Sequence, residues 1–218
     1  YQKNLIHHVS HELKMPIAIL ISNIERSQYE KDPQRWQESL EFQKNGLMQM
    51  STVVTTLLDI SKLETDPAHV FTESVRIDEL IFSCIESLQA VYPNAKFEVA
   101  INTNVNDAGE LSCPGNERML HIAIINVLKN AIAYSDDERV AIEITTEKNT
   151  LRILVDNNGP TLSAKDQAGL FSYFFRGNNT SKKVGIGLGL VMVSKILLLH
   201  QGTILYLITE SNKNRFII

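Results

Sequence analysis

Apolar residues recur at steps of three and four through the early part of the chain, which is the pattern of amphipathic helices. The first stripe consists of Ile6, Val9, Leu13, Ile17, Leu20 and Ile24. It predicts a helix from near the start to about residue 26 or 27. Asp32 and Pro33 then supply a helix N-cap and a first helical residue. The second stripe consists of Trp36, Leu40, Leu47, Met50, Val54 and Leu57, and it predicts a helix to about residue 63.

Two long amphipathic helices joined by a short loop predict an antiparallel hairpin. A hairpin of about 60 residues buries both apolar stripes poorly by itself, so we expect two copies to pair into a four-helix bundle, which gives a homodimer. The alternative is that the hairpin packs against the rest of its own chain. Asp66 and Pro67 follow the second helix. We therefore expect a hairpin domain at 1–66, a linker at 67–72 and a second domain at 73–218.

The pattern changes after the linker to a mixture of period-two and helical spacing. The expected helices cover 75–91 (extended at its start), 117–134, and a stretch from 185 to about 200. The expected strands cover 96–101, 110–113, 140–146, 151–155, 203–208 and 216–218. Helices on one side of a mixed sheet form a two-layer α/β sandwich. The fold class is therefore α+β, with a helical hairpin followed by this sandwich.

Composition excludes several classes of protein. The chain has 218 residues, of which 44% are hydrophobic and 21% charged, and these values are typical of globular domains. A net charge of −4 argues against a nucleic-acid-binding surface. Cys84 and Cys113 lack metal-type spacing and suit a reducing compartment. No apolar run approaches the roughly 18–20 residues of a membrane span. Because the chain opens without Met, directly into a helical pattern, we expect a fragment of a longer protein.

His11 is the first candidate for chemistry. It lies away from the apolar stripe of the first predicted helix, next to Glu12. Pro16 has no N–H, so the carbonyl of Glu12 loses its helical partner and the helix loosens there. An exposed imidazole with an acidic neighbour, beside a weakened turn, is typical of a nucleophile. The alternative is a solvated histidine on a polar helix face.

Asn126 and Asn130 form the second candidate site. They stand four residues apart on the predicted helix 117–134, so both carboxamides lie on one face. The opposite side is expected to consist of Ile122, Ile125, Leu128 and Ile132. Amide oxygens are suitable ligands for Mg²⁺, which prefers oxygen donors and retains waters. The alternative is a pair of polar residues on a wet face.

Gly185, Gly187 and Gly189 alternate at the start of the last predicted helix. Glycines at a helix N-terminus let backbone N–H groups approach phosphate, and the helix dipole favours a negative charge there. The preceding stretch 177–183 is polar and basic, which suits a lid over a triphosphate. The chain contains no Walker-type Gly-Lys-Ser/Thr loop.

Six segments together resemble the catalytic core of bacterial sensor histidine kinases. They are, in order, the H-box at 7–16, the N-box at 121–134, the Asp-x-Gly-x-Gly box at 155–162, the F-box at 170–176, the glycine box at 185–190 and the strand entry at 200–204. The ATPase part of this pattern is also similar to the Hsp90 chaperones, the type II topoisomerases and MutL. The resemblance covers essentially the whole chain.

The resemblance implies a set of roles for the site residues. His11 is the expected phosphoacceptor, Glu12 assists it, and Asn130 holds Mg²⁺. Tyr134 lines the adenine pocket, and Arg176 reaches phosphate. The full set expected to bind ATP is Asn126, Asn130, Tyr134, Asn157, Gly159, Arg176, Lys183, Gly185, Gly187, Leu188 and Gly189. ATP and Mg²⁺ are the expected cofactors.

The chain departs from the family pattern at three positions. Asn157 stands where the adenine-reading Asp is usual, Thr161 replaces the second glycine of that box, and Ala133 replaces a frequent Lys or Arg. The carbonyl oxygen of Asn157 still accepts a hydrogen bond from the adenine amino group, but without charge assistance. On this basis we expect Asn157→Asp to tighten nucleotide binding. A β-branched residue tolerates a positive φ poorly, so the loop at Thr161 is expected to take a different path.

The function implied by the resemblance is a two-component sensor histidine kinase. ATP phosphorylates His11, and the phosphoryl group then passes to an aspartate on the receiver domain of a response regulator. The expected location is the cytoplasmic portion of an inner-membrane sensor, reached through segments outside this chain. The alternative function is a degenerate dimeric scaffold that binds nucleotide without turnover. The sensed signal, the cognate regulator and the choice between cis and trans phosphorylation stay open.

Overall fold

The computed structural model describes residues 17–65, 73–102, 111–147, 150–172, 175, 187 and 189–218. The chain divides into two compact units, Tyr1–Asp59 and Ile60–Ile218. No helix in the described ranges combines the length and the apolar character needed to cross a membrane.

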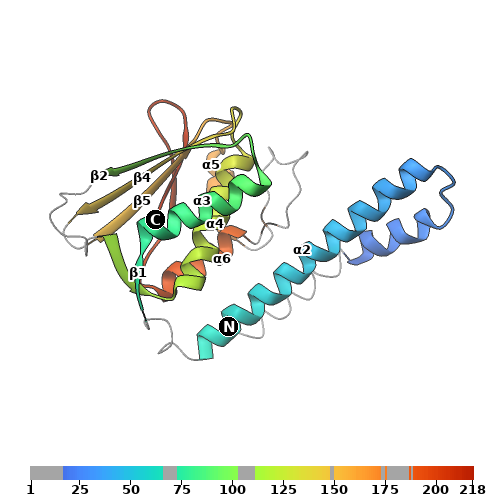
Figure 1. Ribbon diagram of the computed structural model, residues 1–218, viewed down its shortest axis with the longest axis horizontal. Helices are drawn as coiled ribbons and strands as arrows, with labels where there is room; N and C mark the ends of the chain where they lie inside the picture. Colours follow the sequence, from blue (N-terminus) through green and yellow to red (C-terminus); the bar gives the residue numbers. More distant parts are fainter. Residues whose placement is uncertain are drawn as a thin grey trace. The chain divides into compact units, whose positions relative to one another are not determined.

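The first unit contains a helix at 17–27 and most of the long helix α2 (Pro33–Thr65), which changes from blue to cyan along its length in Figure 1. The predicted restart at Asp32 is confirmed, because its Oδ1 accepts a hydrogen bond from the N–H of Gln34 at 3.0 Å. Both predicted helix ends lie within two residues of the observed ones.

The two helices form the predicted antiparallel hairpin. Ser27 and Ser39 share a hydrogen bond between their Oγ atoms at 2.5 Å near the turn. Further from the turn, a Cβ added to Gly46 would lie only 2.7 Å from Cδ2 of Leu20. With distance from the turn, the paired residue numbers fall along the first helix and rise along α2, which defines an antiparallel arrangement. The glycine permits the close approach, and Leu20 is buried against it.

The second unit contains a five-stranded mixed sheet with the order β2-β4-β5-β7-β6. The strands are β2 (Lys96–Asn102), β4 (Arg139–Glu147), β5 (Thr150–Asn157), β6 (Leu205–Ile208) and β7 (Asn214–Ile217). Strands β2 and β4 are parallel, and the other pairs are antiparallel. A separate antiparallel pair joins β1 (Glu73–Arg76) to β3 (Ser112–Gly115).

Helices α3 (Ile77–Val91), α4 (Glu117–Ala133) and α6 (Gly189–Leu199) lie on one side of this sheet, as Figure 1 shows. The short helix α5 (Ala164–Gly169) follows β5. The core is the layer between helices and sheet, because β4 and β5 bury every second residue toward the helices. The predicted two-layer α/β sandwich is therefore confirmed.

Three details differ from the sequence-based expectations. The short strand β3 lies two residues later than expected, so Pro114 and Gly115 belong to the strand. Helix α6 begins at Gly189 and not at 185, since Gly187 has a φ of 74° that no α-helix contains. On α4 the buried residues are Leu120, Ala123, Ile124, Val127, Leu128, Ala131 and Ile132.

The expected apolar side of α4 is therefore partly wrong. Ile122 and Ile125 are only half-buried, whereas Ala123 and Val127 are fully buried. The physical reason is that α4 packs against α3 and α6 as well as against the sheet. A helix with neighbours on several sides buries a wider arc than the stripe that a single apolar seam predicts.

His200 joins the end of α6 to the start of α4. Its Nε2 accepts a hydrogen bond from the N–H of Asn116 at 3.0 Å, and its Nδ1 lies 2.7 Å from the carbonyl oxygen of Ile196. This pattern requires a neutral imidazole with the proton on Nδ1. Burial of the ring lowers the pKa of His200 below its usual value of 6.5, against a smaller raising effect of the Ile196 carbonyl.

The stability of the α/β unit is therefore expected to fall on mild acidification. A histidine whose folded-state pKa is lowered contributes its full share of folding stability above its unfolded pKa. That stability is lost as pH falls below about 6.5. Urea unfolding between about pH 7.5 and pH 5.5 measures this loss. His200→Gln should weaken the pH dependence in this range, whereas the control His121→Gln, on the same unit, should retain it. Equal pH dependence in the wild type and His200→Gln would contradict the assignment.

Candidate functional site

The candidate site lies where α4 ends and β5 ends. Asn157 is the last residue of β5, and its side chain is buried on the same face of the sheet as Ile153 and Val155. Asp156 points to the opposite face, because neighbouring residues in a strand alternate. There it receives two hydrogen bonds from Arg215 on β7, at 2.7 and 2.6 Å. The carboxylate is therefore engaged in a bidentate ion pair, and Asn157 is the residue that faces the helices.

Two backbone carbonyls fix the carboxamide of Asn157. Its Nδ2 donates to the carbonyl oxygen of Tyr134 at 3.0 Å and to that of Asn158 at 3.3 Å. Both partners are acceptors, so the nitrogen end of the amide is assigned by its surroundings. Among the residues that the structure describes, no donor reaches its Oδ1. A buried acceptor without a partner is expected to meet a donor from a ligand.

Gly159 lies directly against the same carbonyl. A Cβ at position 159 would be 2.0 Å from the oxygen of Tyr134. No side chain fits there, which explains the glycine that the sequence pattern singles out. Tyr134 itself is the C-cap of α4, and its N–H donates to the carbonyl of Asn130 at 3.0 Å.

The loop after Gly159 is held by two residues that the sequence reasoning missed. The hydroxyl of Tyr206 accepts from the N–H of Leu162 at 3.2 Å and donates to Oδ1 of Asn214 at 2.6 Å. Nδ2 of Asn214 donates to the carbonyl of Gly159 at 3.4 Å. Thr161 has no positive φ, so the backbone there suits a β-branched residue. No short-range pattern could have indicated these partners, since they come from β6 and β7.

Asn126 and Asn130 differ in what their carboxamides do. Nδ2 of Asn126 donates to the carbonyl of Ile122 at 2.7 Å, and its Oδ1 would be only 2.9 Å from a Cβ at Gly189. Asn126 thus packs against the first residue of α6, and Gly189 permits this approach. Asn130 is half-buried, and within the described residues its side chain makes no hydrogen bond. Its carboxamide oxygen is therefore available to a ligand.

On the face of α4 that carries Asn126 and Asn130, the described ligand suited to Mg²⁺ is an amide oxygen. The described residues contain no group of three or more His, Cys, Asp or Glu side chains that could hold a metal ion. Asn130 offers one hard oxygen ligand, and Mg²⁺ usually takes few protein ligands together with waters and phosphate oxygens. Gly187, two residues before the start of α6, has a φ of 74°, a conformation that favours glycine.

The other predicted site residues lie outside the described part of the chain. They are His11, Glu12, Arg176, Lys183, Gly185 and Leu188. Asn157, Tyr134 and Gly159 are brought together directly, and Asn126 is brought to Gly189.

Two protein families match this chain. Residues 1–66 match the His Kinase A (phospho-acceptor) domain. Residues 115–218 match the histidine kinase-, DNA gyrase B- and HSP90-like ATPase. Among curated relatives, the heme sensor protein HssS of Staphylococcus aureus (strain JH9) is 27% identical over 213 residues, which is 97% of this chain and 45% of the relative. The chain thus spans less than half the length of the curated relatives it matches.

Solved structures share the fold. The Acinetobacter baumannii histidine kinase AdeS superposes with a TM-score of 0.71 at 20% identity, covering 95% of each chain. The histidine kinase ThkA, in complex with the response regulator protein TrrA, gives a TM-score of 0.72 at 22% identity, covering 98% of this chain and 60% of that one. With a phospho-acceptor domain followed by this ATPase fold in one polypeptide, the chain belongs to the sensor histidine kinases.

Proposed function

We propose that this chain is the kinase core of a two-component sensor. It transfers the γ-phosphoryl group of ATP to His11, and from there to an aspartate on a response-regulator receiver domain. The observation that carries the proposal is a phospho-acceptor domain joined to an ATPase unit in which a buried Asn157 presents an unpartnered acceptor. The complex of ThkA with a response regulator supports the proposed partner.

The adenine end of the site rests on Asn157 and its neighbours. Its Oδ1 accepts a hydrogen bond from the exocyclic amino group of adenine, while Nδ2 stays on the carbonyl of Tyr134. A base that carries a carbonyl at this position would place an acceptor against an acceptor and would be rejected. The ring of Tyr134 lines this end of the site, and Gly159 keeps the loop close to it.

The phosphate end of the site rests on α4 and the glycine box. Asn130 is the proposed protein ligand for Mg²⁺, and the bound cation supplies charge neutralisation at the phosphates. Backbone N–H groups around Gly187 and Gly189 face phosphate oxygens at the start of α6. Asn126 packs against Gly189. The further residues proposed to bind phosphate are Arg176, Lys183, Gly185 and Leu188.

The transfer itself requires a neutral imidazole at His11. A ring nitrogen attacks the γ-phosphorus, a nitrogen–phosphorus bond forms, the bond to the bridging oxygen breaks, and ADP leaves. Glu12 receives or orients the proton of the other ring nitrogen. The role of Glu12 rests on the family resemblance.

A homodimer through the hairpin completes the proposal. Within the described residues, most apolar side chains of the two stripes are exposed in the single chain, including Ile24 at 43%, Trp36 at 47% and Leu47 at 59%, whereas Leu20 is buried. Apolar surface of this extent on a hairpin is typical of an interface. A second copy would cover it in a four-helix bundle, with the domain limits at 1–66 and 73–218. Membrane attachment would come only through segments outside this chain, with the present residues on the cytoplasmic side.

Autophosphorylation tests this function directly. The purified protein, incubated with γ-labelled ATP and Mg²⁺, should gain label that is labile in acid and stable in alkali. His11→Ala should abolish the label and leave ADP binding unchanged, because acceptor and nucleotide site lie in different domains. His8→Ala is the matched control and should retain the label. Nucleotide binding without any label in the wild type would favour the non-catalytic scaffold instead.

Asn130→Asp should remove most autophosphorylation activity, since it changes the proposed magnesium ligand. Asn126→Ala should have a milder effect, because the amide of Asn126 is engaged within α4. The measurement is the initial rate of labelling at a series of Mg²⁺ concentrations. A normal rate and a normal Mg²⁺ requirement in Asn130→Asp would show that the metal is held elsewhere.

For Asn157→Asp the surroundings of the side chain argue for weaker nucleotide binding, opposite to the effect expected from sequence. A carboxylate cannot donate to the carbonyls of Tyr134 and Asn158, and it would place a negative oxygen about 3.0 Å from the former. Loss of buried hydrogen bonds of this kind costs about 1–3 kcal/mol. That cost falls on the folded chain, and the carboxylate is expected to turn away from these carbonyls and from adenine. We therefore expect ADP affinity to fall, on the order of tenfold.

Calorimetric titration with ADP measures this affinity. An internal control comes from pH, since a protonated carboxyl regains one donor and should recover part of the affinity in Asn157→Asp. The wild type should not gain affinity on acidification. Tighter binding by the variant at neutral pH would show that charge assistance outweighs the two donated hydrogen bonds.

A further inference from the structure

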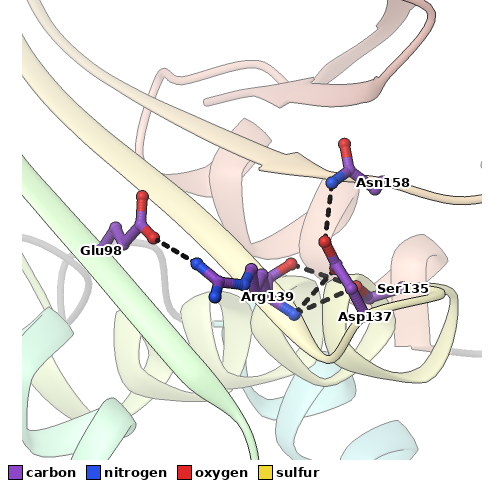
Figure 2. Close-up of polar contacts among 5 residues, drawn as sticks. All are labelled: Glu98, Ser135, Asp137, Arg139 and Asn158. Carbon is purple, nitrogen blue, oxygen red and sulfur yellow. Dashed lines mark hydrogen bonds and ion pairs between the residues drawn. The ribbon is translucent and has the colours of Figure 1, made fainter.

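The carboxylate of Asp137, in the turn between α4 and β4, contacts the residue that follows β5. Oδ2 of Asp137 accepts a hydrogen bond from Nδ2 of Asn158 at 2.8 Å. Its Oδ1 accepts from the hydroxyl of Ser135 at 2.8 Å and from the N–H of Arg139 at 3.1 Å. Figure 2 shows these contacts, together with the ion pair from Arg139 to Glu98 on β2 at 3.2 Å. We refer to the Asp137–Asn158 contact as the clasp.

Backbone contacts run alongside the clasp. The N–H of Asp136 donates to the carbonyl of Asn158 at 2.9 Å. That carbonyl also receives Nδ2 of Asn157. Asn158 is therefore held by its side chain and by its backbone, and its carbonyl is one of the two groups that orient the carboxamide of Asn157. A change at the clasp reaches Asn157 through one shared carbonyl oxygen.

The turn itself needs a local anchor. Glu138 has a φ of 55°, in the left-handed region that a residue with a long side chain rarely occupies. Asp137 closes this turn by accepting from residues on both sides of it, Ser135 and Arg139. The hydrogen bonds from Asn158 and Ser135 hold the pKa of Asp137 down, to about 2. The carboxylate is thus ionised, with both oxygens accepting, across the neutral range.

We propose that Asp137 is a positioning residue of the nucleotide site: through the clasp it fixes the segment 157–159, and with it the direction in which Asn157 presents its Oδ1. This inference rests on the proposed function of the site as an ATP site. Asp137 acts through Asn158 and has no role in the phosphoryl transfer. Its loss should therefore raise the KM for ATP and leave the rate at saturating ATP unchanged.

The experiment uses a charge exchange across the clasp. Asn158→Asp places two carboxylates opposite each other and should weaken ADP binding on the order of tenfold. Asp137→Asn in the same chain restores one donor facing one carboxylate, and the double variant should return to within about threefold of the wild type. Asn158→Ala removes the donor without adding charge and should weaken binding by a smaller factor.

The matched control separates contact from charge. Asp136→Asn combined with Asn158→Asp has the same net charge as the exchanged pair, but the side chain of Asp136 makes no hydrogen bond within the described residues. This control should stay as weak as Asn158→Asp alone. ADP affinity is measured by calorimetry in Mg²⁺ buffer, with thermal unfolding of each variant recorded alongside.

Each result decides the proposal. Rescue by Asp137→Asn but not by Asp136→Asn supports the clasp. If the wild type binds ADP, any of three results overturns the proposal. They are equal rescue by both second substitutions, rescue by neither, and full affinity in both Asn158→Asp and Asn158→Ala. A wild type that binds no ADP overturns the proposed function, and the role of Asp137 with it. If Asn158→Asp lowers the unfolding temperature strongly, the comparison of Asn158→Ala with the wild type decides in the same way.

Discussion

The last carbonyl of a helix needs a partner, because no further turn supplies an N–H to it. In this chain the carbonyl of Tyr134, at the end of α4, receives the side-chain amide of Asn157 from the end of β5. One hydrogen bond thus joins the main helix of the ATPase unit to a central strand of its sheet. The same oxygen leaves no room for a side chain at Gly159. The orientation of the Asn157 carboxamide and the course of the following loop both depend on this contact.

Strand alternation explains why two adjacent polar residues have separate tasks. Asp156 lies on the face of the sheet opposite the helices and pairs with Arg215, where its carboxylate keeps 15% exposure and is matched by a guanidinium. Asn157 faces the helices, where it is 3% exposed and an unpaired charge would be costly. An amide suits this position because it donates to backbone carbonyls and still keeps an acceptor. The departure from the family's Asp is therefore compatible with a site that binds nucleotide.

Periodicity and capping residues predicted the helices and strands. The side chains that support the site could not be predicted in this way, because they come from segments far apart in the sequence. Helix α4 was expected at 117–134 and observed at Glu117–Ala133, since Asn116 provides a cap and accepts from Met119 at 3.2 Å. Asn157 and Gly159 were indicated by their box. Their supports, Asp137 and Tyr206, were not, because a hydrogen bond across sheet neighbours leaves no periodic trace in the sequence. The set of buried residues on α4 was predicted wrongly in part for a similar reason. The apolar pattern of one helix does not reveal how many neighbouring elements pack against it.

The two units differ in how they obtain their stability. The α/β unit buries its own core between helices and sheet, with residues such as Ile81, Val127 and Ile144 fully enclosed. The hairpin has the close contact of Leu20 with Gly46 and a polar cluster at Ser27, Ser39 and Gln43. Most other apolar side chains of its described part stay exposed. A polar cluster between helices sets the register of the two helices more than it adds to the free energy of unfolding. In the proposed homodimer the stability of the hairpin depends on protomer concentration, whereas the core of the α/β unit comes from one chain. On that proposal, nucleotide affinity belongs to a unit whose folding does not depend on whether the hairpin has paired.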